Sequence, residues 1–336
     1  MKVLKAKTLI IVLLVVALSL LAGCGTNNGS KENTQAEKQT KDNYPGKPIT
    51  LLCGWAPGGS MDIVARAIAE AAEPFLGQKI IVVNKEGATG GISYEELSKS
   101  KPDGYTIAVN SPTLLTLPAL GTLHLTYKDL QPVANLCYET GAIVVKKDAP
   151  WKTWKEFEDY VRANPGKVKM GTLTPGGIWH LADVDLMRKT GLKFNLVSFP
   201  STATTIANLM GGHVDAATAS PAEAYTQLKN GEVILLGVMS EERVEAFPDV
   251  PTFKEMGIDI SIASIKGVIA PKGTPSNVIK KLEEAFQKAV ETDKWKTEMK
   301  KKAYTLKYMG SEEYAKFLEE QSRFYESIIT EIGLKK

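Results

Sequence analysis

Cysteine and histidine are scarce in this chain of 336 residues, which contains three of each. No two cysteines form a Cys-x-x-Cys pair, and the scattered histidines make no recognisable pattern of metal ligands. We therefore expect neither a metal nor a cofactor. Apart from Cys24, the cysteines are Cys53 and Cys137, which lie in apolar, strand-like stretches. We expect two separate buried thiols; a disulfide is the alternative if the chain resides outside the cytoplasm.

An excess of charge of one sign and long apolar runs are also missing. Without Lys2, Lys5 and Lys7 the 41 basic residues fall to 38, which equals the number of acidic residues. A balanced chain with no basic stripe argues against nucleic acid as a partner. The apolar run Thr8–Leu20 is about 13 residues long, and a membrane-spanning helix needs about 20.

The N-terminus instead has the layout of an export signal. Three lysines precede the apolar run, and Leu21-Ala22-Gly23-Cys24 follows it. This ending resembles the lipobox of bacterial lipoproteins, which implies a signal peptide over 1–23 and a lipid on Cys24. An ordinary signal peptide with an incidental cysteine is the alternative. Residues 24–43 lack large apolar side chains, so we predict a solvated tether that holds the protein outside the cell membrane.

The stretch from Ile49 to Ala71 is typical of a strand, a glycine-rich turn and a helix. Ile49–Cys53 is apolar, Pro57-Gly58-Gly59 follows, and apolar residues then recur at helical spacing, with Arg66 and Glu70 as an expected ion pair. A helix N-terminus presents free backbone N–H groups, and glycine lets a ligand approach them closely. We therefore predict an anion half-site at this turn.

The same pattern returns in the middle of the chain. A short strand at 168–171 is followed by Thr174-Pro175-Gly176-Gly177 and by a helix that starts at Ile178. Strand and helix patterns alternate elsewhere too, which favours parallel sheets with helices on both faces. Ligands of such sheets bind beyond the carboxyl ends of the strands, where Ser111-Pro112-Thr113 also falls. Two corresponding turns predict a ligand whose carboxylates are held from both sides.

Side chains beside the two turns allow more than one interpretation. Trp55 either stacks on the ligand or lines the wall of its site. Trp179 and His180 are expected at the mouth of the second half-site, where His180 either donates to a carboxylate or has a helix-capping or packing role. Asp62, in a first helical turn, is expected to cap rather than to bind.

An ordered set of motifs resembles a known family. The motifs are Tyr44-Pro-Gly-Lys-Pro-Ile, Trp55-Ala-Pro-Gly-Gly-Ser-Met-Asp62, Pro102-Asp-Gly-Tyr-Thr106, Met210-Gly-Gly-His-Val-Asp215, Pro248-Asp-Val-Pro-Thr252 and Ala270-Pro-Lys-Gly-Thr-Pro275. Together they resemble the Bug-type extracytoplasmic solute receptors, which are the binding components of tripartite tricarboxylate transporters. The resemblance runs from about Tyr44 to the C-terminal helix near Ile332.

The resemblance implies an α/β fold of the two-lobed periplasmic-binding-protein type (type II), with mixed or parallel sheets flanked by helices. Lobe 1 is expected at 44–143 plus 267–336 and lobe 2 at 144–266, with a small organic carboxylate, such as a di- or tricarboxylate, in the cleft between them. The implied partners are two integral-membrane transporter subunits, and we expect a monomer. The ligand residues that the resemblance implies, together with the flanking Trp55, Ile178 and His180, are Ala56, Pro57, Gly58, Gly59, Ser60, Ser111, Pro112, Thr113, Thr174, Pro175, Gly176 and Gly177.

The chain departs from the family pattern at two places. Thr174-Pro-Gly-Gly-Ile-Trp-His180 stands where many members have Gly-Ser-Gly-Ser, and Val197-Ser-Phe-Pro-Ser201 stands where many have Val-Pro-Tyr-Lys-Gly. The missing basic side chain leaves the identity of the ligand open. A receptor that feeds a signalling kinase is the alternative to transport. A hydrolase would need a nucleophile elbow, and a nucleotide site a phosphate-binding fingerprint, and the sequence has neither.

Overall fold

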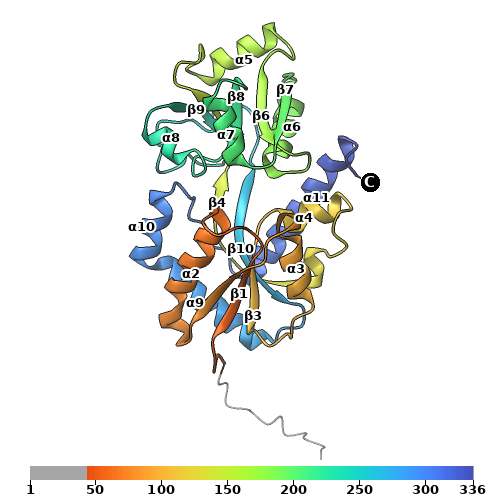
Figure 1. Cartoon of the computed structure of the whole chain (residues 1–336), viewed down its shortest axis with the longest axis vertical. Coiled ribbons are helices and arrows are strands. Elements are labelled where there is room, and N and C mark those ends of the chain that lie inside the picture. Colours follow the sequence, from red (N-terminus) through yellow and green to blue (C-terminus); the bar gives the residue numbers. More distant parts are fainter. Residues whose placement is uncertain (1–43, 336) are drawn as a thin grey trace, which may run out of the picture. The chain divides into compact units, whose positions relative to one another are not determined.

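The computed structural model describes residues 44–335, so the predicted signal peptide, Cys24 and the tether lie outside the described residues. Residues from Tyr44 onward form one compact unit that contains two five-stranded sheets. Both sheets mix parallel and antiparallel strands and carry helices on their faces (Figure 1). The predicted α/β class with mixed sheets is therefore confirmed.

The first sheet has the strand order β2-β1-β3-β10-β4. Strands β1, β2 and β3 are parallel, and β10 runs antiparallel to both of its neighbours. One face is covered by α2, α9 and α10, and the other by α3, α4 and α11. The elements are β1 (Ile49–Cys53), α2 (Ser60–Leu76), β2 (Ile80–Asn84), α3 (Gly91–Ser98), β3 (Thr106–Asn110), α4 (Thr113–Ala119), β4 (Leu130–Thr140), β10 (Ala263–Pro271), α9 (Ser276–Glu291), α10 (Asp293–Lys301) and α11 (Ser311–Glu331).

The second sheet has the strand order β7-β6-β8-β5-β9, in which β6 is parallel to both neighbours and β5 is antiparallel to both of its own. Helices α5 and α6 supply the core on one face, and α7 supplies it on the other. The elements are β5 (Ala142–Lys146), α5 (Trp154–Ala163), β6 (Lys169–Leu173), α6 (Ile178–Thr190), β7 (Asn195–Phe199), α7 (Thr202–Met210), β8 (Ala216–Ala219), α8 (Tyr225–Lys229) and β9 (Val233–Val238).

The chain passes between the sheets at two neighbouring segments. Only Gly141 separates β4 of the first sheet from β5 of the second, and the return path runs from β9 to β10 (Figure 1). The two segments are hydrogen-bonded to each other, because the N–H of Met239 donates to the carbonyl of Gly141 over 2.7 Å and the N–H of Gly141 donates to that of Ile262 over 3.1 Å. The exact lobe boundaries stay a prediction.

Two local expectations are settled by the packing. Cys53 and Cys137 are both buried and unpaired, so the prediction of separate thiols is confirmed. The expected ion pair between Arg66 and Glu70 is wrong. Arg66 turns back to Asp62 over 2.9 Å, and the carboxylate of Glu70 pairs with Lys294 of α10 instead. The buried carboxylate of Asp62 attracts the guanidinium more strongly than an exposed one does.

Candidate functional site

The first glycine-rich turn joins β1 to α2 and leaves the helix N-terminus without a side-chain cap. Gly58 has a φ of +81°, which favours glycine, and Gly59 is the N-cap of α2. The N–H of Gly58 donates to Asp62 Oδ2 over 2.8 Å, and the N–H of Gly59 donates to the carbonyl of Ala56 over 3.2 Å. The N–H groups of both glycines are therefore engaged within the turn, and those at the start of α2 are the ones that the helix leaves without an intrahelical partner.

Asp62 organises this turn. Its carboxylate also accepts from Arg66 Nε over 2.9 Å and from Asn84 Nδ2 over 2.8 Å. Burial acts to raise the pKa of Asp62, but the hydrogen bonds from Arg66, Gly58 and Asn84 outweigh it and lower the pKa below its usual value. The prediction that Asp62 caps the turn is confirmed.

The second turn, between β6 and α6, repeats this arrangement. Gly177 is the N-cap of α6 and has no side-chain hydrogen bond, while its own N–H donates to the carbonyl of Thr174 over 2.8 Å. The N–H of Gly176 donates to His180 Nδ1 over 3.4 Å, so this ring nitrogen is an acceptor. Burial lowers the pKa of His180, which favours the neutral imidazole that such a contact requires. Of the two interpretations of His180, the capping one describes the contact observed.

Trp179 is not at the mouth of the site, contrary to expectation. Its side chain is 1% exposed and packs against the passage between the sheets, where a Cβ added to Gly141 would lie 3.2 Å from the indole ring. The indole Nε1 donates to Glu223 Oε2 over 2.8 Å. The first turn of α6 directs this side chain inward because the apolar surface at Gly141 and Met239 is available to bury it. Trp179 therefore couples the second turn to the passage.

The remaining predicted residues lie where the strands end. Ala56, Pro57, Thr174 and Pro175 are exposed on the two turns, and Ile178 is partly buried. Trp55 is partly buried and packs edge-on against Tyr94, with ring centroids 6.3 Å apart. This contact favours the interpretation in which Trp55 lines the wall of the site. Ser111 and Thr113 open α4 with their hydroxyls 2.9 Å apart, and Ser111 Oγ also accepts from the N–H of Thr113 over 3.3 Å. Pro112 has no N–H, so this third segment presents hydroxyl groups rather than free N–H groups.

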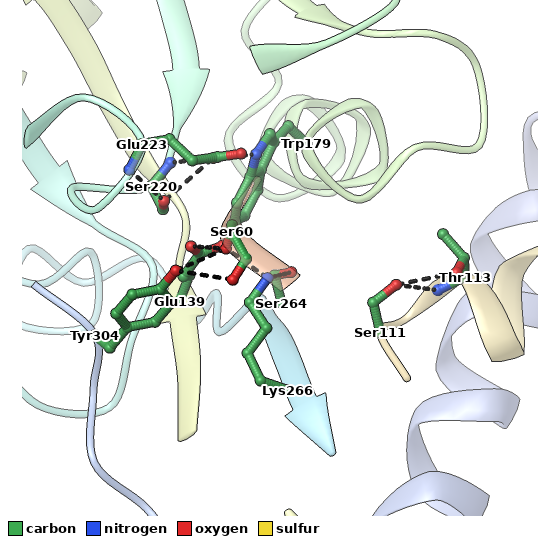
Figure 2. A network of polar contacts seen from close by, with 10 residues as sticks. All are labelled: Ser60, Ser111, Thr113, Glu139, Trp179, Ser220, Glu223, Ser264, Lys266 and Tyr304. Carbon is green, nitrogen blue, oxygen red and sulfur yellow. Dashed lines mark hydrogen bonds and ion pairs between the residues drawn. The ribbon is translucent and has the colours of Figure 1, made fainter. Parts of the chain in front are cut away.

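Sequence reasoning missed a polar cluster beside the first turn. Ser60 Oγ donates to Glu139 Oε1 over 2.7 Å and lies 2.8 Å from the hydroxyl of Tyr304. Glu139 Oε2 pairs with Lys266 Nζ at 3.1 Å, and both side chains are at most 4% exposed. Figure 2 shows these groups converging, with Ser111 and Thr113 set apart to one side. Glu139 and Lys266 stand on β4 and β10, the neighbouring strands at the passage between the sheets.

A second carboxyl faces this cluster from the other sheet. Glu223 Oε2 accepts from the indole of Trp179 and from both the N–H and the hydroxyl of Ser220, each of the latter over 3.1 Å (Figure 2). Burial of the Glu223 carboxyl raises its pKa, and the nearby charge of Glu139 raises it further. Lys266 is already committed to Glu139, so the lysine offers little net positive charge to a ligand.

Some features lie away from these turns. A hollow of about 540 Å³ at the edge strand β9 is lined by apolar side chains such as Phe247 and Val250 and includes none of the predicted residues. Within residues 44–335 no three His, Cys, Asp or Glu side chains are grouped in a way that could hold a metal ion. None of the helices described is both long and apolar enough to cross a membrane.

Two sheets joined by neighbouring segments, with glycine-capped helices at the carboxyl ends of their strands, define the class of solute-binding proteins. Residues 64–334 match the family described as the tripartite tricarboxylate transporter family receptor, TctC, and the chain belongs to this family. The resemblance read from the motifs is thus confirmed.

Individual relatives agree with this assignment. A UPF0065 protein in the gbd 5′ region of Cupriavidus necator is 36% identical over 298 residues, which cover 88% of this chain and 90% of the relative. The crystal structure of a TctC solute-binding protein from Polaromonas is 36% identical, has a TM-score of 0.76, and covers 86% of this chain and 99% of its own. MatC from Rhodopseudomonas palustris, solved with bound malate, is 26% identical, with a TM-score of 0.72 and coverage of 85% and 100%.

Proposed function

We propose that this receptor captures a small organic carboxylate between its two sheets and delivers it to a tripartite tricarboxylate-type transporter with two integral-membrane subunits. The observation that carries the proposal is the pair of helices, α2 and α6, whose N-cap residues, Gly59 and Gly177, have no side chain that could cover the N–H groups of the first helical turn. An uncapped N-terminus has N–H groups and a positive dipole end available for an anion. The relative MatC binds malate, a dicarboxylate, with the same fold.

The charges around the turns indicate how such a ligand is held. Lys266 is neutralised by Glu139, and the nearby Glu223 adds no positive charge. The binding free energy must then come from backbone N–H groups of α2 and α6, the hydroxyls of Ser111 and Thr113, and bridging waters. We propose lobes at 44–143 plus 267–336 and at 144–266, which close on the ligand and present a changed surface to the transporter.

Binding without catalysis is the better account of the polar cluster. The hydroxyl of Ser60 donates to Glu139, whose charge Lys266 already neutralises at 3.1 Å, and it makes no hydrogen bond to a histidine within residues 44–335. A serine nucleophile needs a base that takes its proton. We therefore propose a receptor rather than an enzyme, and we propose that it is a monomer. A receptor that feeds a signalling kinase would have the same ligand site with a different membrane partner.

A thermal-shift screen of the mature protein tests the proposal. We expect one or a few di- or tricarboxylates to raise the melting temperature, because a ligand that binds only the folded state adds about 2.7 kcal/mol at a hundred times its Kd. Amino acids, aromatic acids and neutral sugars complete the panel. A shift with a neutral compound and with no carboxylate would refute carboxylate capture.

Lipid anchoring has its own prediction. The Cys24→Ala variant should be released into the soluble extracytoplasmic fraction when membranes are washed at high salt, because it lacks the thiol that the lipid modifies and salt screens contacts between surface lysines and headgroups. Fractionation and immunoblotting measure this, with Cys53→Ala as the control that keeps the lipid site. Retention of Cys24→Ala in the membrane fraction would show that something other than this lipid holds the protein. Ligand affinity should be the same in both forms.

A further inference from the structure

Basic side chains gather at the edge of the first sheet that lies opposite the ligand turns. The parallel strands β1, β2 and β3 begin at this edge, and the antiparallel strand β10 ends there, with Pro271 paired to Leu130 at the start of β4. The residues just outside these strand ends include six exposed lysines, which are Lys47, Lys79, Lys99, Lys101, Lys128 and Lys272. We call this set the basic edge.

Few acidic groups neutralise the basic edge. Of the described acidic residues, only Asp103 and Asp129 lie at the same strand ends as these six lysines. The hydrogen bonds from the N–H and hydroxyl of Thr126, each over 2.8 Å, and the nearby charge of Lys272 keep the pKa of Asp129 below its usual value. Lys99 approaches Glu95 only to 3.8 Å, and both side chains are more than half exposed, so this pair is weak. A chain with equal numbers of acidic and basic residues after its signal peptide has thus concentrated lysines on one edge.

The basic edge has a hollow and an exposed aromatic side chain. The hollow, of about 470 Å³, is lined by Lys47, Lys99, Lys101, Asp103 and Tyr105 among others. Phe75 stands in the last turn of α2, which ends just before β2, and its side chain is 38% exposed. Lysines around an exposed aromatic ring are the composition of surfaces that rest on lipid headgroups.

The chain enters the fold at the same edge. The hydroxyl of Tyr44 donates to the carbonyl of Gly104 over 2.8 Å, and the N–H of Gly46 donates to the hydroxyl of Tyr105 over 2.9 Å. The first described residue is therefore bound beside Lys47 and Lys101. Only the 19 residues 25–43 separate it from Cys24.

We infer that the basic edge docks on the anionic phospholipid headgroups of the membrane that holds the anchor. The inference rests on the proposed lipidation of Cys24, which keeps the edge within reach of the headgroups. The predicted tether contains Lys31, Lys38 and Lys41 against Glu32, Glu37 and Asp42, so it adds no net charge of its own. Docking by this edge turns the first ligand turn, at the other end of β1, away from the lipid.

Vesicle sedimentation of the unacylated mature chain (residues 24–336 with Cys24→Ser) tests the inference without the anchor. We expect binding to vesicles with about one third phosphatidylglycerol and little binding to pure phosphatidylcholine, with the difference shrinking as salt is added. The triple variant Lys79→Glu, Lys101→Glu, Lys272→Glu should bind on the order of 100-fold more weakly, since each lysine near an anionic surface contributes about 1 kcal/mol.

Matched variants separate this surface from overall charge. Lys167→Glu, Lys193→Glu and Lys229→Glu change the net charge equally at exposed positions around the second sheet and should leave vesicle binding within about threefold of the parent. Replacement of Lys79, Lys101 and Lys272 by arginine should retain binding. Equal affinity for both kinds of vesicle, or an equal loss in both glutamate triples, would overturn the inference. A carboxylate-induced thermal shift persists in either case if the proposed function is right.

Discussion

The Gly59→Val variant is expected to bind its carboxylate at least about 100-fold more weakly than the native protein and to keep its fold. Gly59 has a φ of −73°, which valine adopts readily, and an added Cβ meets only the carbonyl oxygen of Ala56, at 3.3 Å. An N-cap side chain stands over the N–H groups of the first helical turn. The valine methyls would exclude a carboxylate whose charged hydrogen bonds are worth about 1.5–3 kcal/mol each.

Titration calorimetry with the carboxylate found in the thermal-shift screen measures this effect. Ser276→Val is the control, because it adds the same side chain at the start of α9, away from the ligand turns. Gly177 is a poorer position for the experiment, since a Cβ there would lie 2.7 Å from Leu173 Cβ and would disturb the turn itself. Native affinity in a folded Gly59→Val protein would mean that the carboxylate does not bind at α2.

The Asp183→Asn variant is expected to be more stable than the native protein at pH 8, by up to about 4 kcal/mol. Asp183 lies on α6 beneath the second sheet and is fully buried; Thr218 donates to its Oδ1, and its Oδ2 has no hydrogen-bond partner. Burial raises the pKa of Asp183 from 3.8 to about 7. A difference of about three pKa units between folded and unfolded chains corresponds to about 4 kcal/mol.

The sign of the pH dependence follows from proton binding. Below pH 4 both the folded and the unfolded chain hold the Asp183 proton, so the carboxyl then costs no stability. As the pH rises toward 7 the unfolded chain loses the proton first, and the free energy of unfolding falls until the folded pKa is passed. The asparagine side chain of the variant does not titrate, so the advantage of the variant should grow between pH 5 and pH 8.

Urea unfolding at pH 5 and at pH 8 measures the advantage of the Asp183→Asn variant. Asp185→Asn is the matched control on the same helix. Asp185 is also fully buried, but it pairs with Arg188 at 2.8 Å and with Lys189 at 3.1 Å, so its replacement should destabilise the protein. If Asp183→Asn is less stable than the native protein at pH 8, the carboxyl is ionised and favourably bound in the fold.

Local patterns were enough to locate the two turns. Each turn lies between an apolar strand and a periodic helix, and these features depend on neighbours only a few residues apart. Gly191 ends α6 in the left-handed conformation that glycine favours, which is also a local feature of the sequence. The capping role of Asp62 could be expected because this residue lies in the first helical turn, only a few residues after the glycine-rich turn. These parts of the site could be predicted because the residues that form them are close in the sequence.

Contacts that depend on burial or on distant segments of the chain could not be predicted in this way. Arg66 had exposed Glu70 one turn away, but it pairs with Asp62, which the fold buries and joins to Asn84. Trp179 was expected at the mouth of the site, but its side chain is buried against Gly141, where the chain passes between the sheets. A lone lysine within the apolar strand β10 was the available signal for a buried ion pair, and it did not reveal which carboxylate Lys266 would meet.

The sequence by itself determined the alternating elements, the two glycine-capped helix starts, the unpaired thiols and the family, because each is recorded in short patterns. Only the tertiary structure decided that Ser60, Glu139, Lys266 and Tyr304 form one cluster with Glu223 facing it. Ser60 and Tyr304 are 244 residues apart in the chain. Their contact depends on how the first sheet packs against α10 and on where the chain passes between the sheets, which is a property of the whole fold.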